Sequence, residues 1–304
     1  MKILITGSNG YIGSVFRNEA KNHHLIVADI VGGYPRNCLN LEEMYGVFAE
    51  GIDAVVHLAG VVGAPACRKY PIANELDNYT ALNTIISLAN RFNVKKFVYP
   101  SSCSVYGNVE GVYDEVDEST PVLPLTEYAH MKVETEKMLM EELNTPPIIL
   151  RLTTVYGYAP IFRTDLVGNM FILSGMKKEP IRLEGGEQIR SMINVKDVAT
   201  AILRAVEAPN FFGAYSPFIV GNKDGNISLE DFAKLVQEHT GTTINKVGEG
   251  SDRRSYNINP TKFMNAFDWE PMFSTESGII YTIKKLTDFP PVCKSVIENY
   301  SMRF

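Results

Sequence analysis

The 304-residue sequence has no long apolar run. A helix needs about 20 consecutive apolar residues to cross a bilayer, so we expect no membrane-spanning segment. The N-terminal stretch MKILITG has three apolar residues between Lys2 and Thr6, which is fewer than a secretory signal peptide needs. The sequence therefore predicts a cytoplasmic protein.

Cysteine and positive charge are also scarce. The four cysteines form no C-x-x-C pair, so we expect free thiols in a reducing compartment and no metal site. The chain has 29 basic and 35 acidic residues, for a net charge of −6. No basic run is long enough to follow a phosphate backbone or an anionic membrane, so we expect no nucleic-acid or membrane partner.

The first half of the sequence alternates short apolar runs with segments of helical periodicity. This alternation predicts parallel strands joined by helical crossovers. The expected strands are 2–6, 25–29, 54–58, 96–100 and 148–151, and the expected helices are 10–22, 41–49, 78–92 and 127–143. The predicted fold class is α/β, with a doubly wound parallel sheet of the Rossmann type.

After about residue 157 the alternation weakens and glycine, proline and asparagine punctuate shorter elements. We therefore expect two domains. Residues 1–157 would form the nucleotide-binding domain and carry the catalytic groups. Residues 158–304 would form mainly a smaller C-terminal α/β lobe for the substrate, with some segments returning to the large domain.

A glycine-rich stretch between the first strand and the first helix has the spacing G-x-x-G-x-x-G. Glycines permit a tight turn and a close backbone approach to a pyrophosphate at the helix N-terminus. The second strand ends in Asp29, whose carboxylate can bind the adenosine ribose hydroxyls and would repel a 2′-phosphate. The sequence thus predicts NAD rather than NADP, held at Gly7, Gly10, Tyr11, Ile12, Gly13 and Asp29.

The third strand ends in His57-Leu58-Ala59-Gly60. Its small residues would let the cofactor lie against the sheet edge, so we add Leu58, Ala59 and Gly60 to the cofactor site. A lone histidine beside an apolar strand is more often structural than catalytic, and His57 is interpreted that way.

Two further motifs indicate chemistry at a hydroxyl group. The stretch YPSSCSVYG, residues 99–107, follows an apolar run, and Y-A-H-M-K begins a predicted helix. The i,i+4 spacing puts Tyr128 and Lys132 on one helix face, where the ammonium group favours the phenolate and suits Tyr128 to act as a general base. Ser102 would share one substrate hydroxyl with Tyr128.

With these motifs in this order, the sequence resembles the extended short-chain dehydrogenase/reductase family, specifically its nucleotide-sugar epimerases and dehydratases. Further matches are the strand from Asp53, LTTVYG, the string RSMINVKD and the late Trp269-Glu-Pro271. The resemblance implies that Ser102, Tyr128 and Lys132 are catalytic, with Lys132 also holding the nicotinamide ribose, and that Leu39 and Asn78 contact the cofactor.

The same resemblance implies a nucleotide-diphosphate sugar as substrate. Its binding residues would include Ser102, Cys103, Tyr128, Thr154, Asn169, Arg190 and one of the pair Arg253-Arg254, for which we take Arg253. Relatives pair two helices across a two-fold axis. The segments 78–92 and 127–143 carry more apolar side chains than one buried face needs, including Met138, Leu139 and Met140. We therefore expect a homodimer formed through a four-helix bundle.

The sequence departs from the family pattern in three places. Cys38 and Leu39 stand where the family usually has Asp followed by Ile or Leu, and Thr154 replaces a frequent Asn. The two positions after Ser102 are Cys103 and Ser104, where sugar 4,6-dehydratases have Asp-Glu. Those carboxylates perform the proton transfers of dehydration, which a thiol or hydroxyl replaces poorly.

The leading prediction is therefore an NAD-dependent nucleotide-sugar 4-epimerase. The alternatives are a dehydratase or net C4 oxidoreductase, and a C3 or C5 epimerase that uses Cys103 as an acid/base. A simpler interpretation makes Cys103 a small buried hydrophobe. A non-enzymatic alternative is an NAD-sensing regulator, although such proteins typically lose the Tyr/Lys pair, which this chain keeps.

Overall fold

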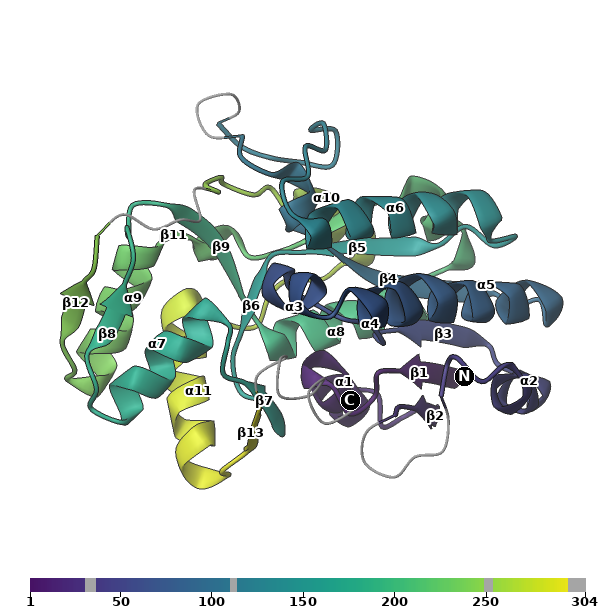
Figure 1. The fold of residues 1–304 in the computed structure, drawn as a ribbon, viewed down its shortest axis with the longest axis horizontal. Helices are drawn as coiled ribbons and strands as arrows, with labels where there is room; N and C mark the ends of the chain where they lie inside the picture. The colour runs from purple at the N-terminus through teal and green to yellow at the C-terminus, as the bar shows by residue number, and fades with distance from the viewer. Residues whose placement is uncertain (31–36, 110–113, 249–253, 295–304) are drawn as a thin grey trace.

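The structure, a computed structural model, describes residues 1–30, 37–109, 114–248 and 254–294. Its centre is a six-stranded sheet in the order β10-β5-β4-β3-β1-β2 (Figure 1), in which every pairing is parallel. The strands are β1 (Lys2–Thr6), β2 (His24–Ala28), β3 (Ala54–His57), β4 (Lys96–Ser102), β5 (Ile148–Leu152) and β10 (Phe218–Val220). The strand order reverses between β1 and β3, which is where doubly wound sheets bind ligands.

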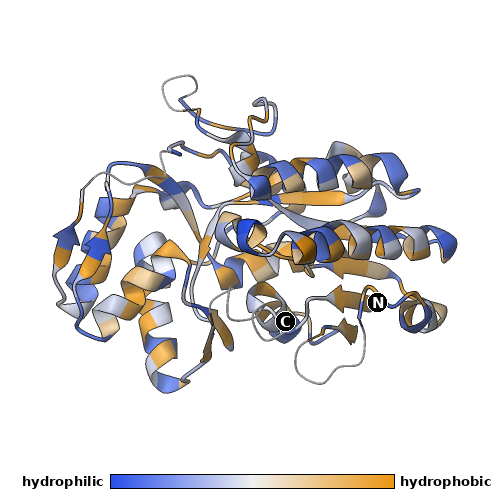
Figure 2. Cartoon of the chain, in the orientation of Figure 1, coloured by the Kyte–Doolittle hydropathy of each residue, from blue (hydrophilic) through white to orange (hydrophobic). Residues whose placement is uncertain are grey.

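Helices cover both faces of this sheet, which explains its continuous apolar strands. Ile3 and Ile5 of β1 point to one face, and Leu4 between them points to the other. One face packs against α1 (Tyr11–Glu19) and α8 (Val195–Glu207). The other packs against α2 (Leu41–Ala49), α5 (Ala81–Arg91) and α6 (Glu127–Glu142). Figure 2 shows the apolar strands between these helices.

The predicted elements of the first half are present, with shifted ends. Helix α1 is shorter than the predicted 10–22 because Gly10 is its N-cap and it ends at Glu19. The predicted helix 78–92 begins instead with a π-helical turn, η1 (Leu76–Thr80), which continues into α5. Strand β4 runs two residues beyond the predicted 96–100 and carries Ser102 to the carboxyl edge of the sheet. A 3-10 turn, η2 (Cys103–Tyr106), follows at once.

The small lobe is built from short strands and three helices around its own core, which includes Phe162, Phe171 and Phe232. Its strands are β6 (Thr154–Tyr156), β7 (Ile161–Arg163), β8 (Ile181–Leu183), β9 (Ile189–Asn194), β11 (Asn226–Ser228), β12 (Ile244–Lys246) and β13 (Val292–Lys294). Its helices are α7 (Val167–Met176), α9 (Leu229–Thr240) and α11 (Thr275–Asp288).

The chain does not stay in the lobe after residue 157. Helix α8 packs on the large sheet, β10 extends that sheet beside β5, and Phe263 of α10 (Thr261–Phe267) packs edge-to-face against Trp269. Shorter turns are η3 (Asn210–Tyr215) and η4 (Lys223–Gly225). Two short helices not predicted from the sequence, α3 (Ala64–Lys69) and α4 (Pro71–Glu75), lie between β3 and η1. Within the described ranges, no helix has the length and apolar composition that crossing a membrane requires.

Candidate active site

The glycine-rich turn between β1 and α1 leaves no space for side chains. Gly7 has a φ of +67°, and a Cβ there would lie 2.6 Å from the backbone nitrogen of Ala59. A Cβ on Gly13 would lie 2.2 Å from the carbonyl oxygen of Gly7. Gly10 caps α1 without a side-chain hydrogen bond, so the helix N-terminus presents its N–H groups at this turn. The turn therefore fits the pyrophosphate of a dinucleotide.

Asp29 follows β2 directly and lies beside this turn. Its Oδ2 accepts a hydrogen bond of 2.8 Å from the backbone nitrogen of Asn9, and the Asn9 side chain accepts one from Arg17. The carboxylate is thus held at the adenosine end of the predicted cofactor site. Leu39 is partly buried against the core on the same side of the sheet, and its predicted contact with the cofactor stays a prediction.

The end of β3 and the π-helical turn approach each other closely. A Cβ on Gly60, whose φ is +148°, would lie 2.2 Å from Oδ1 of Asn78. Asn78 donates to the carbonyl oxygen of Val61 at 3.0 Å and to Oδ1 of Asn74 at 2.7 Å. The amide thus fixes the loop that leaves β3, and π-helical turns often occur at functional sites because they redirect a side chain.

His57 is buried, and its Nδ1 lies 2.9 Å from Oγ1 of Thr6. Burial lowers the pKa of this imidazole to about 3. The ring is therefore neutral at physiological pH, in agreement with the structural interpretation of His57.

The three predicted catalytic residues meet at the carboxyl edge of the sheet. Ser102 ends β4, while Tyr128 and Lys132 lie in the first two turns of α6, whose N-cap is Thr126. Ser102 lies close enough to Tyr128 to lower the pKa of the phenol. The Lys132 ammonium lies 5.9 Å from the Tyr128 ring centroid. It donates to the Tyr99 hydroxyl and to the Pro100 carbonyl oxygen, each at 2.9 Å.

The electrostatics of this group differ in part from the sequence expectation. Burial raises the pKa of Tyr128 above its ordinary value, while Lys132 and Ser102 oppose the rise. Burial also lowers the pKa of Lys132, and the neighbouring Tyr128 and Glu136 oppose that change. Lysine therefore acts on the phenol in the expected direction, but desolvation has the larger effect in this structure.

Cys103 is the first residue of η2, and its thiol is directed into the protein. The side chain is buried in a cluster that includes Val105 and Ile219, and Sγ donates to the carbonyl oxygen of Arg151 at 3.4 Å. Burial raises the pKa of the thiol far above its usual range. This environment favours the packing interpretation over an acid/base or substrate role.

The predicted substrate residues of the lobe mostly bond to the protein itself. Asn169 is fully buried, accepts from the backbone nitrogen of Gly157 at 2.8 Å, and donates to the Arg163 carbonyl oxygen and the Tyr11 hydroxyl. Arg190 on β9 donates to the carbonyl oxygens of Ile189 and Arg254.

Thr154 begins β6, two residues after β5 ends, and is half-buried. Arg253 lies outside the described residues. The roles of Thr154, Asn169, Arg190 and Arg253 toward a substrate stay predictions.

The sequence did not predict the buried cluster that packs against Tyr128. Val61, Ala66, Cys67 and Ala73, from α3, α4 and the loop before them, form a buried cluster against which Tyr128 packs. Pro65 and Pro71 lie at the starts of these two helices, and proline favours the first helical turn. Those prolines were the available signal for α3 and α4.

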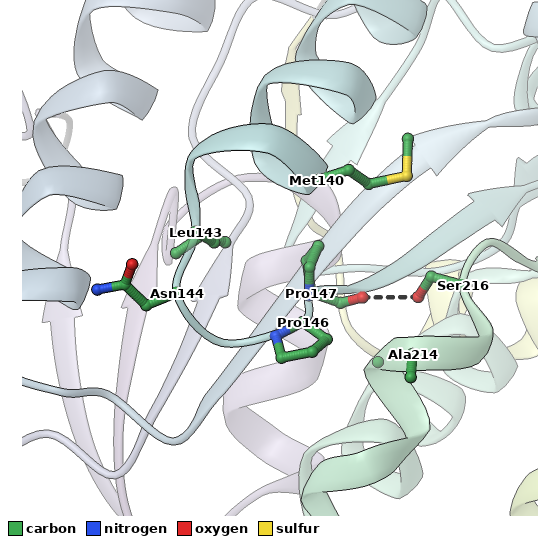
Figure 3. Close-up of a pocket in the computed structure, with 8 residues that line it drawn as sticks. Met140, Leu143, Asn144, Pro146, Pro147, Ala214 and Ser216 are labelled. Carbon is green, nitrogen blue, oxygen red and sulfur yellow. Dashed lines mark hydrogen bonds between the residues drawn. The ribbon is translucent and has the colours of Figure 1, made fainter.

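A shallow pocket of about 220 Å³ lies elsewhere, between the end of α6 and the loop before β10. Figure 3 shows Met140, Leu143 and the prolines before β5 around it, with Ser216 donating to the Pro147 carbonyl oxygen at 2.6 Å. This is the amino end of the parallel sheet. Tyr128 is 12 residues from Met140 along α6, about 18 Å at the rise of an α-helix, so the pocket is separate from the candidate active site.

The fold and the sequence both have known counterparts. Residues 3–221 match the model of the NAD dependent epimerase/dehydratase family. The chain belongs to this family. The family is one of NAD-dependent enzymes, and the glycine-rich turn and Asp29 described above fit that cofactor.

Individual relatives are distant. The chain is 29% identical to the uncharacterized UDP-glucose epimerase YtcB of Bacillus subtilis (strain 168) over 243 residues, which cover 70% of this chain and 75% of that protein. The UDP-glucose 4-epimerase of Thermotoga maritima, solved with UDP-glucose, superposes with a TM-score of 0.84 at 24% identity and covers 95% of this chain and 99% of its own.

A dehydratase is nearly as similar in fold. The dTDP-glucose 4,6-dehydratase of Bacillus anthracis, solved with NAD, gives a TM-score of 0.81 at 22% identity, covering 95% of this chain and 97% of its own. At these identities the structural likeness shows the fold alone. Epimerase and dehydratase members are both represented, so the reaction must be argued from the site.

Proposed function

We propose that the protein is an NAD-dependent nucleotide-sugar 4-epimerase. The C4 hydroxyl of the sugar would bind between Ser102 and Tyr128, which lie close enough for Ser102 to lower the pKa of the Tyr128 phenol. Tyr128 accepts the hydroxyl proton as general base, and Lys132 stabilises the phenolate. NAD, when bound, would supply the acceptor for the C4 hydride and the donor for its return. The ketosugar would rotate in the pocket between the two hydride transfers. The hydride would then reach the opposite face of C4, and no net redox change would result.

The observation that carries this proposal is the chemistry of the two residues after Ser102. Cys103 directs its thiol to the Arg151 carbonyl oxygen, and the Ser104 side chain is buried. Removing water across C5 and C6 needs an acid and a base at those carbons. Neither position supplies a carboxylate, which supports epimerisation over dehydration.

Two carboxylates of α6, those of Glu127 and Glu136, do not supply the missing groups. Glu127 is exposed and pairs with Arg68, and Glu136 is buried in an ion pair with Arg151. The proton transfers of a 4-epimerase need only Ser102 and Tyr128 at the reacting hydroxyl, so the site is sufficient for that reaction.

The substrate is proposed to be a nucleoside diphosphate sugar. The names of YtcB and of the Thermotoga maritima enzyme favour a UDP-sugar. Arg190 and Arg253 would bind the diphosphate, since guanidinium groups suit phosphate oxygens. Thr154 would contact the sugar. Asn169 would not contact the substrate and would act only by holding the residues to which it bonds.

We also propose a homodimer through α5 and α6, although the apolar side chains of α6 support it less than the sequence suggested. Leu139 is fully buried in the protein's own core, Met138 packs against that core, and Met140 is 52% exposed. The surplus of apolar side chains inferred from the sequence is thus largely used within one chain. The exposed residues of both helices are mostly polar. Sedimentation velocity would test the dimer directly.

The cysteines agree with a reducing compartment. Cys38, Cys67 and Cys103 are buried and free, and Cys293 is exposed and free. We therefore retain the cytosol as the proposed location.

The proposed reaction is tested by mixing the purified protein with UDP-, GDP-, CDP- and dTDP-sugars in deuterated water and following the sugar ring signals by NMR. We expect a C4-inverted product without ring deuterium and without added NADH, because 4-epimerisation exchanges no carbon-bound proton. A 4-keto-6-deoxy product would establish dehydration instead. Ring deuterium that disappears in Cys103→Ala would make the thiol an acid/base at C3 or C5. Tight NAD binding without turnover of any sugar would favour a regulator.

A further inference from the structure

A buried ion pair lies beneath the catalytic residues, and the reaction proposed above does not use it. Arg151 of β5 donates from Nη2 to Glu136 Oε2 at 2.7 Å and from Nε to Oε1 at 3.1 Å. The two side chains are only 8% and 3% exposed. Taking two charges out of water is costly, so a buried pair is weak evidence for stability alone. Its remaining contacts indicate another reason for it.

Those contacts hold the chain on both sides of Ser102. Ser101, the preceding residue, donates from its hydroxyl to Glu136 Oε1. Tyr106, the last residue of η2, accepts a hydrogen bond of 2.9 Å at its hydroxyl from Arg151 Nη1. Ser101 and Tyr106 are both buried. The pair therefore fixes the end of β4 and the turn that follows it.

The other side of the pair belongs to the helix that carries the proposed base. Glu136 lies four residues after Lys132 and eight after Tyr128 on α6, so all three share one helix face. Glu136 also acts on Lys132 through its charge, since it raises the pKa of the ammonium against the effect of burial. One carboxylate thus connects the helix of Tyr128 and Lys132 with the strand of Ser102.

We propose that Glu136 and Arg151 are positioning residues that fix the place of the Ser102 hydroxyl relative to the Tyr128 phenol. The pair does not touch the substrate; it acts through Ser101 and Tyr106 on the segment between them. Displacing a reacting group by about 1 Å can cost 100-fold in rate. This inference rests on the roles proposed above for Ser102, Tyr128 and Lys132.

The test cuts the contacts to the Ser102 segment while leaving the ion pair itself intact. Ser101→Ala removes the hydroxyl bound to Glu136, and Tyr106→Phe removes the one bound to Arg151. Tyr156→Phe is the matched control. Tyr156 is equally buried, and its hydroxyl donates to the Thr275 carbonyl oxygen at 2.9 Å in the lobe. Each tyrosine variant thus loses one buried hydroxyl bond.

We expect Ser101→Ala and Tyr106→Phe to lower kcat roughly 10- to 100-fold, with KM and the Kd for NAD within about twofold of wild type. Tyr156→Phe should leave kcat within about twofold of wild type, even if its melting temperature falls as much as that of Tyr106→Phe. In a Ser102→Ala background, Tyr106→Phe should have little further effect. A kcat loss of the same size in that background, or an equal loss in Tyr156→Phe, would overturn the proposal.

A second measurement does not depend on activity. Crystal structures of NAD-bound wild type and Tyr106→Phe give the separation of the Ser102 and Tyr128 hydroxyl oxygens. We expect it to increase by about 0.5 Å or more, the tolerance of a preorganised site. An unchanged separation would refute the positioning role. If instead no nucleotide sugar is turned over by wild type, the proposed reaction fails, and this measurement still decides the role of the pair.

Discussion

The carboxyl edge of the large sheet and the small lobe use their polar side chains in different ways. At the sheet edge, Ser102 and Lys132 both lie close to Tyr128 and lower the pKa of its phenol. In the lobe, Asn169 and Arg190 bond to backbone carbonyl oxygens. The hydroxyls proposed to be catalytic thus lie together without a substrate, whereas a substrate bound in the lobe would have to replace contacts that the protein already makes. Mutations in the two regions should therefore affect different measured quantities.

The largest effect is expected at the base. Tyr128→Phe should lower kcat by about 10²–10⁴, the usual contribution of a positioned general base, while NAD binding and the melting temperature change little. Steady-state kinetics and calorimetry would check this. Near-normal turnover would show that another group accepts the proton and that the sheet edge is not the preorganised region we describe.

Lys132→Met should reduce both the rate and the affinity for NAD, because one ammonium is assigned to two partners. It should also move the acidic limb of the pH dependence, along which the rate rises as the base loses its proton. Lys132 lowers the pKa of Tyr128, so its removal raises that pKa, and kcat/KM should reach its plateau at higher pH than in wild type. A profile that stays in place while the rate falls would contradict the electrostatic role of Lys132.

Asp29→Ala tests the cofactor side of the same edge. The loss of a carboxylate that accepts hydrogen bonds from the ribose should cost about 1.5–3 kcal/mol of NAD binding free energy, and the preference for NAD over NADP should narrow. Asp231→Ala, on the exposed first turn of α9, is the control and should change neither. Equal affinity of the wild type for NAD and NADP would refute the assignment of Asp29.

The smallest effect on turnover is expected in the lobe. Asn169→Ala removes side-chain bonds to Gly157, Arg163 and Tyr11 and leaves buried groups unpaired. It should lower the free energy of unfolding by about 1–3 kcal/mol, measured by urea titration, with little change in KM. A raised KM at unchanged stability would instead support the substrate contact inferred from the sequence.

The sequence predicted the sheet edge well because its signals are local. Glycine spacing, an acidic residue after the second strand and the i,i+4 pair Tyr128 and Lys132 each act within a few residues. Parallel strands then bring their ends together at one edge. The predicted NAD cofactor and the Rossmann-type sheet are confirmed by the family match and the structural neighbours. The strand and helix ends shifted by a few residues, since caps decide them.

The partners of the site residues were not predictable in this way. Arg151 and Glu136 are 15 residues apart and on different elements, and Tyr99 reaches Lys132 from β4. The buried cluster beside Tyr128 comes mainly from two helices that are too short to show a helical periodicity in the sequence. Asn169 was assigned from the family resemblance, but only the packing of the lobe decides that its amide bonds to Gly157, Arg163 and Tyr11. Side-chain orientation of this kind depends on contacts distant in the sequence.

The π-helical turn at Leu76–Thr80 has a consequence for the length of the chain. A π turn accommodates one residue more than an α-helical turn, and each residue rotates a helix by about 100°. Deleting one residue from this segment would let the helix continue regularly. Then either α5 would present a different stripe to the sheet, or Asn78 would turn away from Gly60 and Val61. A regular α-helix cannot keep both the core-facing stripe of α5 and the position of Asn78. The one extra residue of the π turn therefore lets a single helix pack against the core and still direct an amide to the end of β3.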